Sequence, residues 1–259
     1  MDFSLDRFRL DGKVAIVTGV GGKGNSIGRA YAIGLARAGA SVVLANRTEV
    51  GAMAVAEEIE AEGGRAIGIH VDVTDEASTL AMAQAAVTAF GGIDILVNNA
   101  ALMTELTHQP VDTTSLEEWD RILAVNLTGP LLCTRAVVPT MRRRGGGRIV
   151  NMSSAGAYPA TTLYGVSKIA LVGLTTTIAK QLGRDNITCN AIAPGNIRTG
   201  GSNVTDDSPF VRHLETIVAT RARGNPDELV GALLMLCSPA GDFITGQVIH
   251  IDGGWVMRP

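Results

Sequence analysis

The sequence predicts an α/β protein in which a parallel sheet of about seven strands carries helices on both faces, the doubly wound arrangement. Two observations make this prediction. The apolar runs are short and nearly continuous rather than alternating, which is typical of strands buried on both faces of a parallel sheet. These runs alternate strictly with longer stretches of helical spacing, and strand–helix alternation implies right-handed crossovers between parallel strands.

In the first part of the chain, glycines and polar residues bound each expected element. Four apolar runs (KVAIVT, SVVLA, RAIGIHV and IDILVN) indicate strands at 13–18, 41–45, 65–71 and 93–98. Helical spacing between these runs predicts helices that end on glycines, at 26–39, 49–64 and 76–92.

The second part continues the same alternation. A long helical zone is expected at about 116–144, where RRRGGG ends it. Three more apolar runs (RIVNMS, ITCNAIA and QVIHID) and two helical stretches predict strands at 148–153, 187–193 and 247–252 and helices at 162–183 and 226–237. Because we find neither repeat nor linker, we expect residues 1–259 to form one domain. The irregular stretch 195–222 suits a substrate lid, with a plain surface loop as the alternative.

Composition excludes several classes of protein. With 46% hydrophobic and 18% charged residues, the 259-residue chain is neither disordered nor fibrous. A net charge of −3 gives no general attraction to nucleic acid or to an anionic membrane. We expect no membrane span, because no run reaches about 18 consecutive apolar residues. The protein is expected in the cytoplasm, because its three cysteines show no CxxC pattern and its N-terminus is too polar for a signal peptide. The four histidines lack metal-ligand spacing, so no metal is expected.

A glycine-rich segment, TGVGGKGNSIGRA at 18–30, joins the first expected strand to the first helix. In a doubly wound (Rossmann) sheet this turn holds a dinucleotide pyrophosphate: glycines let the backbone approach, and free N–H groups at the helix N-terminus bind the negative charge. A simple tight turn is the alternative. Its position directly after the first strand favours cofactor binding.

From about residue 10 onward, the chain resembles the short-chain dehydrogenase/reductase family. Thr18, Gly19 and Gly28 match its TGxxxGxG motif, although the loop is three residues longer and Ser26 replaces the middle glycine. The resemblance implies that Gly19, Ser26, Ile27 and Gly28 bind the cofactor. The SIG triplet is similar to the enoyl-reductase branch of the family. That branch separates its tyrosine and lysine by six residues, and the corresponding position here is Thr161.

The second strand ends in a sequence that bears on the choice of cofactor. A carboxylate there favours NAD, whereas a nearby arginine accommodates the 2′-phosphate of NADP. This chain has Asn46 followed by Arg47, which favours NADP, with NAD possible and with Lys23 as a further cation. Alternatively, Arg47 is a solvated side chain at a helix start.

Two further stretches resemble motifs on the cofactor side of the family. Asp72 and Val73 match the motif whose acid accepts a hydrogen bond from the adenine amino group, and the alternative is helix N-terminal chemistry near Thr74. Asn98, Asn99 and Ala100 match the NNAG motif, with Ala101 in place of its glycine. The resemblance implies that Asp72, Val73, Asn99 and Ala100 bind the cofactor.

Tyr164 and Lys168 lie at i and i+4, on one face of the expected helix. With Asn126 and Ser154 they follow the order of the family's catalytic tetrad, with Ser153 as the rival serine and a helix-surface pair as the alternative reading. A free tyrosine has a pKa of about 10, and a lysine ammonium at about 4 Å could lower it by about three units. We therefore expect Lys168 to lower the pKa of Tyr164.

The resemblance also gives each tetrad residue a role. Tyr164 is the acid/base, Ser154 binds the substrate oxygen, Lys168 binds the nicotinamide ribose and Asn126 holds a water that connects Lys168 to solvent. After the sixth strand, APGNIRT matches the family's PG motif, so Pro194, Gly195, Ile197 and Thr199 are expected at the cofactor, with a plain turn as the alternative.

These observations predict an NAD(P)-dependent oxidoreductase that transfers a hydride between nicotinamide and a ketone or secondary alcohol. The resemblance favours a 3-oxoacyl-type reductase, with an NAD-linked alcohol or sugar-alcohol dehydrogenase and a non-catalytic cofactor-binding protein as alternatives. The expected partner is a small carbonyl or alcohol substrate, without nucleic acid or membrane. The family's frequent dimers and tetramers imply a homo-oligomer, with a homotetramer expected.

Overall fold

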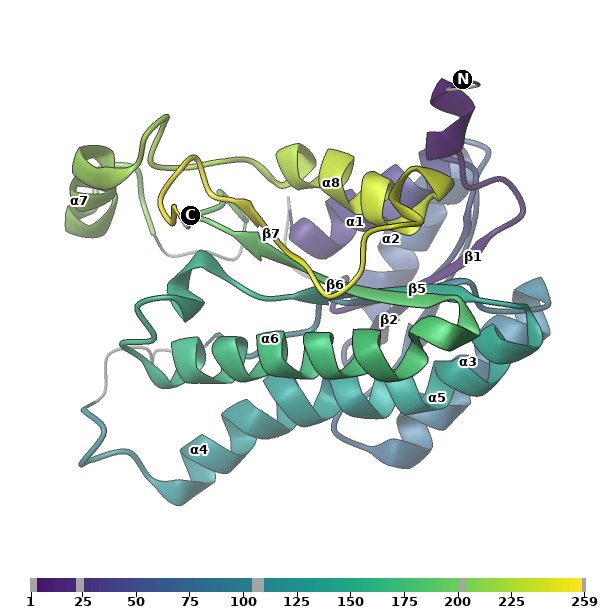
Figure 1. The fold of residues 1–259 in the computed structure, drawn as a ribbon, viewed down its shortest axis with the longest axis horizontal. Helices are drawn as coiled ribbons and strands as arrows, with labels where there is room; N and C mark the ends of the chain where they lie inside the picture. The colour runs from purple at the N-terminus through teal and green to yellow at the C-terminus, as the bar shows by residue number, and fades with distance from the viewer. Residues whose placement is uncertain (1–3, 22–25, 104–109, 201–203, 258–259) are drawn as a thin grey trace.

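A seven-stranded parallel sheet forms the centre of the computed structural model, which describes residues 4–21, 26–103, 110–200 and 204–257. The strand order is β3-β2-β1-β4-β5-β6-β7, and every neighbouring pair is parallel. The strands are β1 Val14–Thr18, β2 Ser41–Asn46, β3 Arg65–His70, β4 Ile95–Asn98, β5 Gly147–Met152, β6 Ile187–Pro194 and β7 Val248–Ile251. The doubly wound fold class predicted from the sequence is confirmed (Figure 1).

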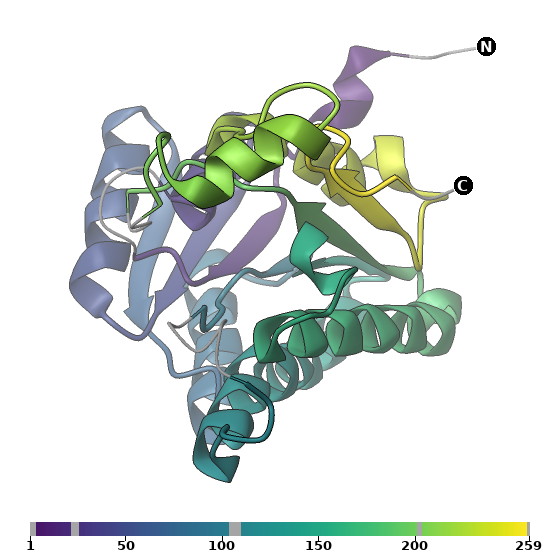
Figure 2. The ribbon, with the colours of Figure 1, turned by 90° about the vertical axis from the view of Figure 1, so that its left-hand side faces the viewer.

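Helices cover both faces of the sheet. The α-helices are α1 Ile27–Arg37, α2 Glu49–Ala61, α3 Glu76–Phe90, α4 Leu116–Leu123, α5 Gly129–Arg143, α6 Leu163–Leu182, α7 Pro209–Ile217 and α8 Val230–Cys237. Figure 1 shows α1, α2 and α8 above the sheet and α3, α5 and α6 below it. Figure 2 places α7 and α4 on opposite sides of the sheet. The short helix η4 (Ala155–Ala157) follows β5.

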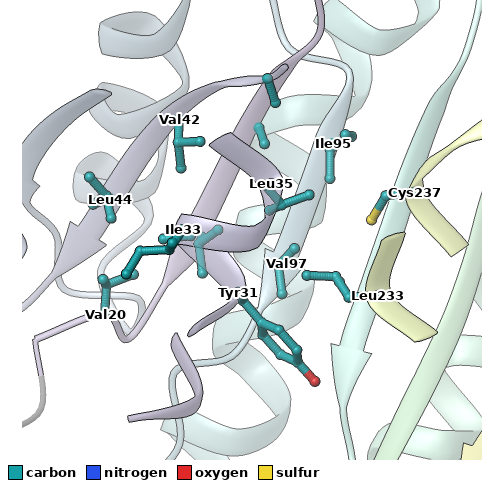
Figure 3. Packing of buried hydrophobic residues seen from close by; sticks show 14 of the residues in the cluster. Val20, Tyr31, Ile33, Leu35, Val42, Leu44, Ile95, Val97, Leu233 and Cys237 are labelled. Carbon is teal, nitrogen blue, oxygen red and sulfur yellow. The ribbon is translucent and has the colours of Figure 1, made fainter. Parts of the chain in front are cut away.

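The alternation of side chains along each strand builds a core on either face. In β1, Ala15 and Val17 belong to the cluster under α1, α2 and α8, whereas Val14 and Ile16 face α3, α5 and α6. Figure 3 shows the first cluster, where Tyr31 and Leu35 of α1 lie near Val97, Leu233 and Cys237. The whole of β1 is buried on both faces, which explains its unbroken apolar run.

The long helical zone expected at 116–144 differs from a single α-helix. A π-helical segment, η3 (Ala124–Thr128), separates α4 from α5 and places Asn126 in the interior. Such π turns rearrange the backbone locally and often occur at functional sites. The run Leu116–Arg143 is long and apolar enough to cross a membrane, but half of its most apolar window is buried. That burial, with residues of α5 in the core under the sheet, is what a core helix of a doubly wound protein shows.

Candidate active site

The turn after β1 is too tight for side chains. Gly19 has a φ of +74°, and a Cβ there would lie 2.6 Å from the Ala100 Cα. A Cβ at Gly28 would lie 2.5 Å from the Gly19 carbonyl oxygen and 2.7 Å from the Asn99 Nδ2. The Asn99 amide also donates to the Thr18 and Gly19 carbonyls, at 2.9 and 3.0 Å. These contacts fasten the glycine-rich turn to the end of β4.

Helix α1 begins directly after this turn. Ser26 is its N-cap, and its Oγ accepts a hydrogen bond from the Arg29 N–H. Ser26 therefore replaces the expected glycine with a residue that starts the helix, which leaves the Ile27 and Gly28 N–H groups at its N-terminus without an intrahelical partner. The expected further cation, Lys23, lies outside the described residues.

We expect Gly28→Ala to disrupt this turn. Its Cβ must displace the Gly19 carbonyl, so the free energy of unfolding should fall by about 1–3 kcal/mol and cofactor affinity should fall with it. Gly173→Ala on α6 is the matched control, because its Cβ meets nothing within 4 Å and should raise helix stability by up to about 1 kcal/mol. Urea unfolding and cofactor titration measure both quantities. Equal effects of the two substitutions would contradict the tight turn.

The residues expected near the adenine end lie at the ends of β2 and β3. The Asn46 Nδ2 donates to the Thr48 carbonyl at 2.9 Å, and Arg47 is exposed. The Asp72 Oδ1 accepts from both the N–H and the Oγ1 of Thr74, at 2.9 and 2.7 Å. These bonds, followed by the positive charge of Arg47, hold the pKa of Asp72 below its usual value. The local turn weighed as the alternative for Asp72 is therefore present.

Val73 is the buried neighbour of Asp72. It packs against Gly129 at the start of α5, where a Cβ would lie 2.9 Å from the Val73 Cγ2. Its side chain therefore belongs to the core under the sheet, so only its backbone is left for a ligand.

Tyr164, Ser154 and Lys168 come together at the carboxyl end of β5. Tyr164 is in the first turn of α6, and its phenol hydrogen-bonds the Ser154 side chain. The Lys168 Nζ lies 5.5 Å from the centre of the Tyr164 ring and donates to the Met152 carbonyl at 2.8 Å. Ser153 instead donates to the Lys168 carbonyl at 3.3 Å. Of the two serines, the structure places Ser154 beside the phenol.

The expectation that Lys168 lowers the pKa of Tyr164 is wrong for this structure. Burial raises the pKa of Tyr164 to about 12, with the Ser154 hydrogen bond opposing the shift, and burial lowers the pKa of Lys168 to about 7. The simple Coulomb argument omitted the desolvation of both groups, which disfavours the phenolate and the ammonium alike. Tyr164 therefore keeps its proton at neutral pH and can donate it.

Asn126 uses its side chain inside the protein. Its Oδ1 accepts from the Leu102 N–H at 2.7 Å, and its Nδ2 donates to the Leu102 carbonyl and to the Ser167 Oγ, each at 3.0 Å. Ser167 in turn donates to the Tyr164 carbonyl at 2.7 Å. Both Asn126 N–H groups are therefore committed, so the expected water cannot be held through them. Sequence reasoning missed Ser167, although a small hydroxyl residue directly before Lys168 was the available signal.

The Pro-Gly segment turns at the end of β6. Pro194 is buried, the Gly195 N–H donates to the Ile251 carbonyl at 3.0 Å, and a Cβ on Gly195 would lie 2.7 Å from the Asp252 Cα. Ile197 forms a β-bridge with Gly224, and Thr199 is half-buried. A cavity of about 180 Å³ opens beside this turn; it is lined by Gly195, Asn196, Ile197, residues 220–229 in part, Ile251, Asp252 and Gly253. Tyr164 and Lys168 do not line this cavity.

Comparison with known proteins identifies the family to which the chain belongs. A family model described as enoyl-(acyl carrier protein) reductase matches residues 21–256. An uncharacterized oxidoreductase of Mycobacterium tuberculosis strain H37Rv is 45% identical over 249 residues, which cover 96% of this chain and 99% of the relative. The 3-oxoacyl-[acyl-carrier-protein] reductase of Aquifex aeolicus is 37% identical, covering 95% of this chain and 98% of the relative.

A solved structure shows the same likeness in three dimensions. It is a gluconate 5-dehydrogenase from Burkholderia cenocepacia in complex with NADP and tartrate. Its TM-score is 0.90 at 36% identity, and the match covers 97% of this chain and 98% of that one. The chain therefore belongs to the short-chain dehydrogenase/reductase family and is an oxidoreductase that acts on a CH–OH or carbonyl group with a nicotinamide cofactor.

Proposed function

We propose that this protein is an NADP(H)-dependent reductase of a ketone, with the reverse oxidation of a secondary alcohol, in which Tyr164 is the general acid/base. One observation carries the proposal. Tyr164 is half-buried, and its phenol keeps its proton at neutral pH, hydrogen-bonds Ser154 and lies beside Lys168. This group lies at the carboxyl ends of the parallel strands, where the glycine-rich turn also begins. A proton donor next to a hydroxyl that can hold a carbonyl oxygen is what ketone reduction requires.

The cradle at the end of β1 fits a dinucleotide. Its two glycines exclude side chains, and the α1 N-terminus supplies N–H groups for a phosphate. Asn46 offers no carboxylate to a ribose hydroxyl, and exposed Arg47 offers a cation to a 2′-phosphate. The NADP in the Burkholderia relative supports the same choice. The residues proposed to hold the cofactor are Gly19, Ser26, Ile27, Gly28, Asn46, Arg47, Asp72, Val73, Asn99, Ala100, Tyr164, Lys168, Pro194, Gly195, Ile197 and Thr199.

Arg47→Ala tests the choice of cofactor. We expect it to weaken NADP binding by roughly 10-fold or more, because one charge-assisted contact is lost, and to leave NAD binding nearly unchanged. Arg184→Ala is the matched control, because it also removes an exposed arginine. Arg184 lies between α6 and the start of β6, at the amino ends of the strands and therefore away from the glycine-rich turn. Titration of both cofactors against both variants is the measurement. Equal losses for NADP and NAD in Arg47→Ala would remove the basis for NADP.

The residues of this chain divide the work of the reaction. NADPH supplies the hydride when it is bound. Ser154 holds the substrate oxygen, and Tyr164 delivers a proton to that oxygen, which its raised pKa allows at neutral pH. Lys168, whose Nζ donates to the Met152 carbonyl, lies near the phenol and would donate to the ribose hydroxyls of a bound cofactor. Asn126 holds α6 against the segment around Leu102.

For the substrate, we propose a 3-oxoacyl-type ketone. The Aquifex reductase supports it, while the Burkholderia gluconate 5-dehydrogenase supports the second candidate, a sugar-alcohol or related hydroxy acid. The test is oxidation of NADPH with a panel of 3-oxoacyl thioesters and keto sugars. Turnover of the thioesters supports the first candidate, turnover of keto sugars alone supports the second, and tight cofactor binding without any turnover contradicts the proposed enzyme.

We also propose one domain over residues 1–259 with a lid within 195–222. In that segment α7 places Val211 and Leu214 in a small apolar cluster with Trp255, so part of the lid rests on the C-terminal segment.

We also propose a homo-oligomer, a dimer or tetramer, in the cytoplasm. Exposed Leu131 and Phe243 support the homo-oligomer, and light scattering measures its size. Three buried free cysteines support the cytoplasmic location.

A further inference from the structure

A series of hydrogen bonds between polar groups joins the segment after β4 to the backbone of Tyr164. The Leu102 backbone exchanges two hydrogen bonds with the Asn126 amide, at 2.7 and 3.0 Å. The same amide donates to the Ser167 Oγ at 3.0 Å, and the Ser167 Oγ donates to the Tyr164 carbonyl at 2.7 Å. Asn126 and Ser167 are both 0% exposed, so water does not compete for these bonds.

The donors and acceptors that serine and asparagine carry determine the direction of each hydrogen bond in this series. A serine hydroxyl has one proton, which Ser167 gives to the Tyr164 carbonyl. Its lone pairs then face the Asn126 amide, which must present Nδ2 rather than Oδ1. The amide oxygen is left for the Leu102 N–H. Only this arrangement satisfies every group, so Leu102 and Tyr164 are linked by one defined set of hydrogen bonds.

This link reaches both sides of the site. Leu102 follows Asn99 and Ala100, whose N–H groups donate to the Thr18 Oγ1 at the glycine-rich turn, at 3.1 and 3.0 Å. At the other end, Tyr164 is held twice: its phenol by Ser154 and its carbonyl by Ser167. A shift of Ser167 would therefore move the phenol relative to the turn that is proposed to hold the cofactor.

We propose that Ser167 is a positioning residue that keeps the Tyr164 hydroxyl in register with the glycine-rich turn, an inference that rests on the proposed function. Its hydroxyl is buried and bonded to Asn126 and to the Tyr164 carbonyl, so it would act through the Tyr164 backbone. Because proton transfer depends steeply on the placement of the donor, loss of this hydroxyl should lower turnover more than it lowers cofactor binding.

The same helix provides a matched control. Thr175 on α6 is also 0% exposed, accepts from the Asn151 Nδ2 at 3.0 Å and donates to the Leu171 carbonyl at 2.8 Å. Its contacts reproduce those of Ser167 two turns farther along, away from Tyr164. Ser167→Ala and Thr175→Val each remove a hydroxyl with little change of shape, and each leaves one asparagine N–H unpaired. Both should lower the melting temperature by a similar few degrees.

The experiment compares these variants with wild type in the ketone assay and in cofactor titration. We expect Ser167→Ala to lower kcat by about 10- to 100-fold with NADPH affinity nearly unchanged, and Thr175→Val to keep kcat within about twofold. Ser167→Cys keeps the size with a weaker donor and should give an intermediate kcat. If Ser167→Ala does not fold, the kcat of Ser167→Cys relative to wild type tests the positioning role instead, and a kcat equal to that of wild type would overturn it.

Hydrogen exchange gives a readout that does not depend on turnover. The Leu102 N–H should exchange faster in Ser167→Ala than in Thr175→Val, because only the first substitution loosens Asn126. Equal kcat values in Ser167→Ala and wild type, or equal losses in both variants, would overturn the positioning role. A wild-type protein that turns over no ketone would overturn the proposed function instead, and the exchange rates would still test the link.

Discussion

Tyr164→Phe is expected to lower kcat for ketone reduction by about 10²- to 10⁴-fold, the contribution of a well-placed general acid. The phenol is the group beside Ser154 that keeps its proton at neutral pH, because burial raises its pKa to about 12. Phenylalanine preserves the ring and its packing near Lys168 but has no proton to give. NADPH should still bind, because Tyr164 is only one of the residues proposed to hold it and the glycine-rich turn and the α1 N-terminus are untouched.

Tyr31→Phe is the matched control for this prediction. Tyr31 is fully buried in α1, and its hydroxyl has no hydrogen-bond partner among the described residues. Its removal should leave kcat unchanged and should not destabilise the protein, since no bond is broken. Steady-state kinetics and NADPH titration of both variants give the comparison. A Tyr164→Phe variant that keeps its turnover would show that another group supplies the proton.

Lys168→Met is expected to abolish most activity while relieving a cost of folding. Lys168 is 2% exposed, and burial lowers its pKa to about 7 from its ordinary value of about 10.4. Between these two values the unfolded chain binds more protons than the folded protein, so wild-type stability rises as the pH increases from about 7 to about 10. Below pH 7 the folded protein carries the full cost of a buried ammonium.

Methionine removes that pH dependence. We expect the stability of Lys168→Met relative to wild type to be most favourable below pH 7 and to decline toward pH 10, while kcat falls by about 10²-fold or more. Lys180→Met, at an exposed position on the same helix, should show no such trend. Urea unfolding at pH 6 and pH 9 measures the difference. The same relative stability at both pH values would mean that the Lys168 ammonium is not buried at a cost.

Much of the fold follows from the pattern of apolar runs, because a strand buried on both faces leaves little choice of residue. All seven strands lie within two residues of their expected bounds. The π turn at Asn126 could not be predicted, since it changes one register of hydrogen bonds without changing the helical spacing. Helix α7 lies inside the stretch expected to be irregular, where Ser208 caps it and Pro209 starts it.

The candidate site shows a similar division. The sequence predicted that Ser154, Tyr164 and Lys168 lie close together, because all three follow β5 along the chain and its carboxyl end determines where they meet. Spacing did not separate Ser153 from Ser154; the backbone at the end of β5 does, by turning Ser153 toward the Lys168 carbonyl. The direction of the pKa shifts was also beyond the sequence, because desolvation depends on burial that only the folded structure shows.

The most direct test of the central claim is a crystal structure with NADP and an unreactive alcohol bound. We predict that the Tyr164 hydroxyl and the Ser154 Oγ both lie within hydrogen-bond distance of the alcohol oxygen, on the side of the reactive nicotinamide carbon. An alcohol oxygen bound elsewhere, with the Tyr164 hydroxyl directed away from the nicotinamide, would contradict this account.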